Sequence, residues 1–162
     1  MKHNYLKHLF TALLLLCTTV ATAHDFEVGG IYYNITSERE KTVGVCGGIN
    51  DYHYGLYGRY NIPETIVYKN VTYSVTSIEE RAFYKNDGLI YIAFPHSIKT
   101  IGDEAFYGCI NFGTIILPDG LTNIGESAFK STGLKSVTFK DLNLLSDSAF
   151  MNCSELKTVN MP

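Results

Sequence analysis

Short runs of apolar residues recur at a nearly fixed interval along the second half of the chain. Each run begins with an apolar residue, which is followed three and five positions later by two more. The alternation at the end of the run is typical of a β-strand. The four runs are Leu89–Phe94, Phe112–Leu117, Leu134–Phe139 and Leu156–Met161. Proline follows three of them, which predicts a clean end to each strand.

A second motif ends in Ala-Phe and precedes each run. It reads Ile-x-x-x-Ala-Phe three times and Leu-x-x-x-Ala-Phe once, and its phenylalanines are 23, 23 and 21 positions apart. The copies are Ile78–Phe83, Ile101–Phe106, Ile124–Phe129 and Leu145–Phe150. A period of this length is typical of a solenoid, in which each unit packs only on its neighbours. We therefore predict that the four phenylalanines form one row inside a continuous core.

Residues 24–77 contain no Ala-Phe copy and are rich in Tyr, Val and Ile, with Gly between the apolar stretches. The pattern predicts two pairs of strands. Ile31–Ile35 would pair with Thr42–Val45, and Ile62–Tyr68 would form a hairpin with Val71–Val75. Such a β-rich cap would cover the first strand edge of the solenoid. The predicted organisation is a cap over 24–77 and repeats over 78–162.

The first 23 residues have the pattern of a secretory signal peptide. Two lysines precede the apolar run Leu9–Val20, and Ala21-Thr22-Ala23 forms a small-x-small cleavage signature. A lipid anchor at Cys17 is the alternative, but that chemistry needs a small residue where Leu16 stands. Cleavage would leave 139 residues with 11 basic and 16 acidic side chains, a net charge of −5. This charge argues against nucleic acid and anionic membranes as partners.

Three cysteines follow the predicted cleavage site, and an odd number leaves at least one free thiol. Cys109 and Cys153 each lie three residues after a repeat phenylalanine, two repeats apart. At about 4.8 Å per strand this is roughly 9–10 Å, whereas a disulfide needs Cα atoms within about 7 Å. We predict that both are buried, reduced, structural thiols. The state of Cys46 stays open.

The repeats resemble the leucine-rich repeats of the BspA-like class (Bacteroides surface protein A type). The family unit resembles C-x-x-L-x-x-V-x-I-P-x-x-V-x-x-I-G-x-x-A-F, and the best match runs from Cys109 to Phe129. The departures lie between Phe129 and Phe150, where the unit is two residues short and Lys140 replaces proline. The resemblance implies a mainly β leucine-rich-repeat solenoid of about four 21–23-residue units with an N-terminal β-rich cap. It also implies a bacterial surface location and, for some members, adhesion to host matrix.

Motifs for catalysis and metal binding are absent from the sequence. There is no G-x-S-x-G, H-E-x-x-H, P-loop, G-x-G-x-x-G or zinc-type C-x-x-C. We expect no enzyme activity, no catalytic residues, no metal and no cofactor. An acidic ladder (Glu79-Glu80, Asp103-Glu104, Glu126 and Asp147) leaves a calcium site as an alternative to a solvated turn. The solvated turn is preferred, because calcium needs roughly six to eight converging oxygens.

Strand alternation places a second set of side chains opposite the core, on one continuous face that is mostly small and polar. Solenoids commonly bind ligands along such a sheet, whereas an ordinary solvated sheet, in which Thr is favoured by β-propensity, is the competing interpretation. The candidate binding residues are Tyr91, Thr114, Ile116, Ser136, Thr138, Thr158 and Asn160, with Lys135 and Lys157 just before their strands.

A tyrosine-rich segment in the cap forms a second candidate site. Exposed Tyr beside Arg suits contact with protein or sugar, but closely spaced Tyr would equally suit a cap strand with one buried face. Its residues are Tyr52, Tyr54, Tyr57, Arg59 and Tyr60.

These observations predict an exported, non-catalytic protein that recognises protein or glycan at the cell surface, either secreted or surface-attached. No later segment has 18 consecutive apolar residues, so no transmembrane helix is predicted. The alternative is an assembly module. The sequence ends at Pro162 on a repeat strand without a polar cap, which predicts end-to-end homo-oligomers.

Overall fold

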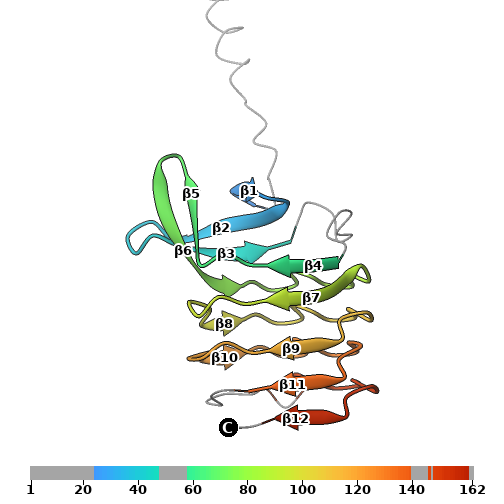
Figure 1. The fold of residues 1–162 in the computed structure, drawn as a ribbon. Coiled ribbons are helices and arrows are strands. Elements are labelled where there is room, and N and C mark those ends of the chain that lie inside the picture. Colours follow the sequence, from blue (N-terminus) through green and yellow to red (C-terminus); the bar gives the residue numbers. More distant parts are fainter. Residues whose placement is uncertain (1–23, 48–57, 140–145, 147, 161–162) are drawn as a thin grey trace, which may run out of the picture.

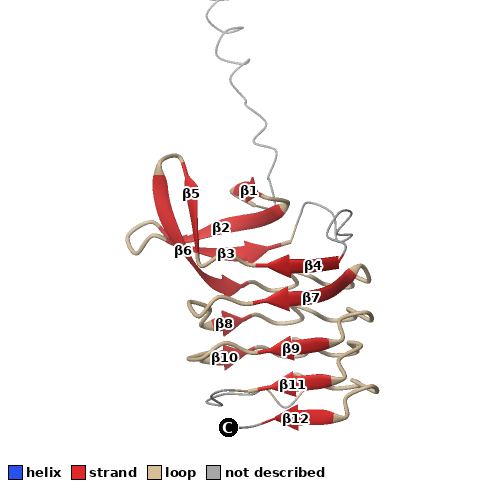
Figure 2. Ribbon diagram, viewed as in Figure 1, coloured by secondary structure: helices blue, strands red, loops and turns tan. Residues whose placement is uncertain are grey.

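The computed structural model describes residues 24–47, 58–139, 146 and 148–160, and all regular elements among them are β-strands. The strands of the repeats are stacked along one axis (Figures 1 and 2). One stack consists of β4 (Gly58–Asn61), β7 (Leu89–Ala93), β9 (Thr114–Ile116), β11 (Ser136–Thr138) and β12 (Thr158–Asn160). The predicted mainly β repeat solenoid is confirmed.

A second parallel stack faces the first across the core. Its order is β3 (Thr42–Cys46), β6 (Val71–Ile78), β8 (Thr100–Ile101) and β10 (Asn123–Ile124). Where strands pair within a stack, equivalent apolar residues of successive repeats lie opposite each other. Val137 pairs with Ile115 and Val159, and Ile101 pairs with Ile78 and Ile124. The first stack consists of two hydrogen-bonded sheets, β4–β7 and β9–β11–β12, and the second stack is described as far as β10.

The predicted row of phenylalanines lies in that interior. The ring centroids of Phe83, Phe106, Phe129 and Phe150 are 5.0, 5.1 and 5.0 Å apart in sequence, and neighbouring ring planes are within 7° of parallel. The first three side chains are at most 1% exposed, and Phe150 is half-buried. The ring spacing is close to the separation of about 4.8 Å between neighbouring strands. One ring is thus added with each repeat.

The Ala-Phe turn is itself hydrogen-bonded from repeat to repeat. The backbone N–H groups of Phe83, Phe106 and Phe129 donate to the alanine carbonyls of the following repeat, at 2.7, 2.7 and 2.8 Å. The residues two positions before or after each phenylalanine have a left-handed backbone conformation, with φ between 52° and 72°. They are Arg81, Lys85, Glu104, Gly108, Ser127, Ser131 and Asn152. This alternation directs every second N–H toward the neighbouring repeat, so the turn backbone is satisfied without helix.

The cysteines serve the same stacking. The Sγ atoms of Cys109 and Cys153 each donate to a phenylalanine carbonyl of an earlier repeat, Phe83 and Phe129, at 3.0 Å. Both cysteines and Cys46 are free, which confirms the predicted thiols. Burial raises the pKa of Cys46 and of Cys109 to about 12, so both stay protonated. Cys153 is half-buried rather than buried as predicted, because no described repeat lies beyond it.

The cap is built from β1 (Phe26–Val28), β2 (Ile31–Ser37) and β5 (Thr65–Tyr68), which extend the β3–β6 side of the solenoid. The two predicted pairs are confirmed as antiparallel β2–β3 and β5–β6. The β5–β6 turn has φ of 48° at Lys69 and 62° at Asn70, as in a type I′ hairpin. β6 runs through residue 77, where we predicted the boundary between cap and repeats, and this division of the chain stays a prediction. The predicted signal peptide lies outside the described residues.

Glu79 joins the cap to the first repeat. Its Oε2 accepts a hydrogen bond from Asn34 Nδ2 at 2.7 Å, and a Cβ at Gly44 would come within 2.6 Å of its Oε1. The next repeat has Gly102 at this position, where a Cβ would collide with the backbone of the preceding turn. Burial raises the pKa of Glu79, which the Asn34 hydrogen bond opposes and the nearby Asp25 carboxylate reinforces.

Replacing Phe106 by alanine is expected to lower the free energy of unfolding by about 3–5 kcal/mol, because its ring contacts four other aromatic rings. Phe150→Ala should cost less, since Phe150 is half-buried and contacts two rings. Urea unfolding followed by circular dichroism measures both losses. Equal losses would contradict a row that is most tightly packed at its centre.

Gly102→Ala is expected to lower the free energy of unfolding by about 1–3 kcal/mol, because the new Cβ would lie 2.6 Å from the backbone nitrogen of Glu80. Gly113→Ala is the matched control, since nothing lies within 4 Å of its Cβ position. It should be neutral or stabilising by up to about 1 kcal/mol. The same unfolding experiment tests both, and a similar loss for the two variants would refute the close approach of successive turns.

The raised pKa of Glu79 predicts a pH-dependent stability. The folded state binds this proton more tightly than the unfolded chain, so the contribution of Glu79 to stability falls as pH rises from about 4.5 through the raised pKa. Glu79→Gln keeps the acceptor for Asn34 and removes the charge. The variant should exceed the unsubstituted protein in stability at about pH 7.5 and lose that advantage near pH 4. A stability difference that does not change with pH would contradict this.

Candidate functional site

The predicted binding face is formed by the stack from β4 to β12. Ser136 pairs with Thr114 and Thr158, and Thr138 pairs with Ile116 and Asn160, in unbroken parallel register. Because equivalent residues pair directly, the outward side chains form two straight rows that run along the axis of the solenoid. The structure thus brings these six predicted residues together on one surface.

The two rows are open to solvent and polar in most positions. Thr114, Ile116, Thr158 and Asn160 are exposed, while Ser136 and Thr138 are half-buried. Ser136 Oγ donates to Thr114 Oγ1 at 3.5 Å, and Asn160 Nδ2 donates to Thr138 Oγ1 at 3.2 Å. Each hydroxyl offers one donor and two acceptor positions, so these contacts leave capacity for a ligand.

Two lysines stand beside these rows. Lys135 and Lys157 are exposed and directly precede β11 and β12. Lys157 N donates to Lys135 O at 3.0 Å, and Lys135 N donates to Gly113 O at 2.7 Å. The lysines therefore occupy equivalent positions in adjacent repeats, as the sequence predicts.

The tyrosine-rich segment is divided by the structure. Strand β4 pairs in parallel with β7 and sets Arg59 opposite Tyr91, with the guanidinium carbon 4.9 Å from the ring centroid. Tyr60 is half-buried and packs against the core. Arg59 thus belongs to the sheet face beside Tyr91, whereas Tyr60 supports it from within. Tyr52, Tyr54 and Tyr57 lie outside the described residues.

Strand β4 and its place in the face are not predicted by the repeat pattern. The apolar pattern predicts that Ile62-Pro63 starts a hairpin strand, but β5 begins only at Thr65. The sequence does contain a signal for β4, because Tyr60-x-Ile62-Pro63 has the spacing that ends the later repeat strands, as in Ile115-x-Leu117-Pro118. Ile62 is buried and its N–H donates to Ala93 O at 3.0 Å, which continues the β4–β7 pairing.

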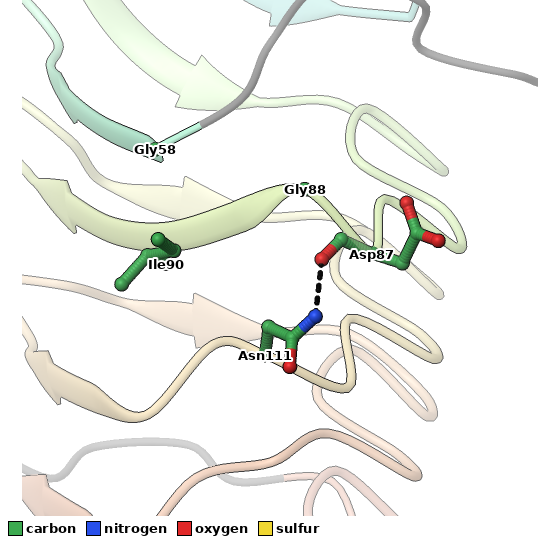
Figure 3. Close-up of a pocket in the computed structure, with 5 residues that line it drawn as sticks. All are labelled: Gly58, Asp87, Gly88, Ile90 and Asn111. Carbon is green, nitrogen blue, oxygen red and sulfur yellow. Dashed lines mark hydrogen bonds between the residues drawn. The ribbon is translucent and has the colours of Figure 1, made fainter.

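A hollow of about 710 Å³ lies at the β4–β7 end of this face (Figure 3). Asn111 Nδ2 donates to the backbone carbonyl of Asp87 at 2.7 Å and ties two successive turns together. Ile90 is 50% exposed and supplies the apolar part of the lining. The full lining consists of Gly58, Asp87, Gly88, Ile90 and Asn111. The repeat pattern does not reveal this hollow, because its residues lie mostly in turns.

Four carboxylates of the acidic ladder lie elsewhere, around a hollow of about 250 Å³ lined by Glu80, Asp103, Glu104, Glu126 and Ser127. Glu79 lies apart from them and binds Asn34, and Asp147 lies outside the described residues. Glu104 Oε2 lies 3.5 Å from Arg81 Nε, and Asp103 Oδ1 accepts the backbone N–H of Glu126 at 2.8 Å. Two of the carboxylates thus already have partners in the fold. Within the described part of the chain, no group of three or more His, Cys, Asp or Glu side chains is placed to hold a metal ion.

None of the described residues belongs to a helix that is long and apolar enough to cross a membrane.

Comparison with protein families gives a match over residues 61–162, in six copies, to the BspA type leucine rich repeat region. The match begins at the end of β4, ahead of the first Ala-Phe motif. No curated protein matches the chain.

Several solved structures share the fold. A leucine-rich repeat protein from Bacteroides ovatus is 32% identical, with a TM-score of 0.62 over 86% of this chain and 42% of its own. The pneumococcal vaccine antigen PcpA is 24% identical, with a TM-score of 0.68 over 85% of this chain and 38% of its own. A leucine rich cell surface protein from Faecalibacterium prausnitzii is 20% identical, with a TM-score of 0.58 and coverages of 85% and 42%. The chain thus spans about two fifths of the length of these three proteins.

Proposed function

This chain belongs to the BspA-type leucine rich repeat family, and we propose that it is a non-catalytic recognition protein that binds a protein or glycan outside the cell through the face of β4, β7, β9, β11 and β12. The signal-peptide pattern of residues 1–23 supports export. Secretion and attachment to the cell surface both fit this role.

The observation that carries the proposal is the unbroken register of the outward rows across β9, β11 and β12. Residues that are scattered at intervals of about 22 positions in the sequence become direct neighbours, as Thr114, Ser136 and Thr158 do. An extended surface of this kind can contact a long ligand at many points. A single isolated polar strand would not.

The chemistry of the face supports binding over catalysis. The rows consist of hydroxyl, amide and aliphatic side chains, with Tyr91 and Arg59 at one end. Neither row contains a histidine or a carboxylate that could serve as a general base. The hydroxyls are instead suited to accept and donate hydrogen bonds to a bound polar chain.

End-to-end association through the last repeat remains the alternative, and it stays a prediction. β12 is exposed along its length, and Val159 is 51% exposed. A further repeat in a longer chain would cover β12 as β12 itself covers β11. Its exposure therefore does not favour a second copy of the protein over more of the same chain.

A bulky charge placed in the middle of the face should block recognition. In Thr138→Glu the new side chain would project among Ile116, Ser136 and Asn160, and binding to ligands captured on an array of matrix proteins and glycans should fall at least about tenfold, or 1.4 kcal/mol. Thr72→Glu is the matched control, because Thr72 is exposed on the β5–β6 hairpin. Thermal unfolding verifies that both variants fold. Equal binding by the two variants would refute the use of this face.

A further inference from the structure

We propose that the ligand of the sheet face is a linear polysaccharide with regularly spaced acidic groups, and that Lys135, Lys157 and Arg59 bind those groups. The inference rests on the proposed function and narrows it to one class of ligand.

The first supporting observation is a repulsive arrangement of like charges. Lys135 and Lys157 are exposed at equivalent positions of adjacent repeats, joined by the 3.0 Å hydrogen bond from Lys157 N to Lys135 O. Like charges held at neighbouring strand ends repel each other. The salt bridges of the described residues, Lys41–Glu38 and Arg81–Glu104, include neither lysine. An anion lying across both ammonium groups would remove the repulsion.

Arg59 supplies a third cation at the other end of the same face. Its guanidinium carbon lies over the Tyr91 ring, 4.9 Å from the centroid, and its side chain is exposed. A guanidinium beside an aromatic ring can still bind a carboxylate or sulfate with two hydrogen bonds. The salt bridges in the described part of the chain do not involve Arg59 either.

The separation of these cations indicates a polymer. From β4 to β12 the face crosses five stacked strands, so Arg59 and Lys157 are roughly 19 Å apart at about 4.8 Å per strand. A single sugar or a small anion cannot reach both ends. Between them lie the two rows of hydroxyl and amide side chains, which repeat with the same spacing and can bind the neutral parts of a chain.

The same surface fits a sugar chain better than an acidic peptide. Peptides commonly bind sheets by adding a strand at an open edge, and β12 forms such an edge at the end of the stack. A peptide bound there would contact Lys157 but would leave Arg59, roughly 19 Å away, without a partner. A polysaccharide needs only side-chain hydrogen bonds and flat apolar patches. Tyr91 and the 48% exposed Ile116 provide such patches between the cations and the hydroxyls.

The experiment compares polymers that share a backbone and differ in charge. Polygalacturonate, which carries one carboxylate per sugar, is titrated against the protein by calorimetry beside the same polymer after methyl esterification. The acidic form should bind at least about fivefold more tightly. Its affinity should fall as salt is raised, because salt screens exposed charges. Dextran sulfate distinguishes sulfate from carboxylate as the preferred group, and poly-glutamate tests an acidic peptide.

The variants separate a specific site from general charge attraction. Lys135→Gln with Lys157→Gln should weaken binding of the acidic polymer at least about fivefold. Lys69→Gln with Lys99→Gln changes the net charge equally, but these exposed lysines lie on the cap hairpin and beside β8. This control should keep its affinity within about twofold. Thermal unfolding shows whether all four substitutions leave the fold intact.

Three results would overturn the inference: equal losses in the two double variants, equal binding of the esterified polymer, or tighter binding of poly-glutamate. Absence of binding to both acidic polysaccharides would also overturn it. The proposed function would survive any of these if an array ligand is still lost in Thr138→Glu and retained in Thr72→Glu. If Thr138→Glu changes nothing, both proposals fail.

Discussion

The spacing of about 4.8 Å between hydrogen-bonded strands is the constraint on which this structure depends. Two strand stacks and the Ala-Phe turns must all advance by this amount from one repeat to the next. The phenylalanine rings meet the requirement with centroid spacings of 5.0–5.1 Å, within the range of offset aromatic pairs. Core, sheets and turns therefore share one period, and a side chain that fits one repeat fits its neighbours.

The invariant features of the repeat follow from this short spacing. Ala82, Ala105 and Ala128 are fully buried where successive turns meet, and a Cβ at Gly102 would collide with the preceding turn. The third unit shows how the constraint tolerates a deletion. Its shortened turn draws Gly133 against the carbonyl of Ile110, where a Cβ has no room. The strand after it still pairs in register, so the one residue that is missing between Phe129 and Leu134 is absorbed in the turn.

Sequence spacing was sufficient to predict the phenylalanine row, the free thiols and both cap hairpins, because each depends on periodicity or on local turn chemistry. It failed for β4, whose only signal is the short Tyr60-x-Ile62-Pro63 pattern and whose partner, β7, lies about 30 residues away. The position of Arg59 on the candidate binding face therefore depends on the pairing of β4 with β7. The hollow beside Ile90 could not be predicted from sequence spacing either, since it depends on how two turns stack through the Asn111–Asp87 hydrogen bond.

The same constraint that builds the core also determines what a ligand meets outside it. Register in a parallel stack places equivalent residues side by side, so each outward side chain lies about 4.8 Å from the equivalent side chain of the next repeat. Thr114, Ser136 and Thr158 form a hydroxyl row for this reason, and Lys135 is forced beside Lys157. The fold gains nothing from the second arrangement, because like charges on neighbouring strands repel. This pair of cations beside a periodic polar surface is the feature on which the proposed acidic ligand depends.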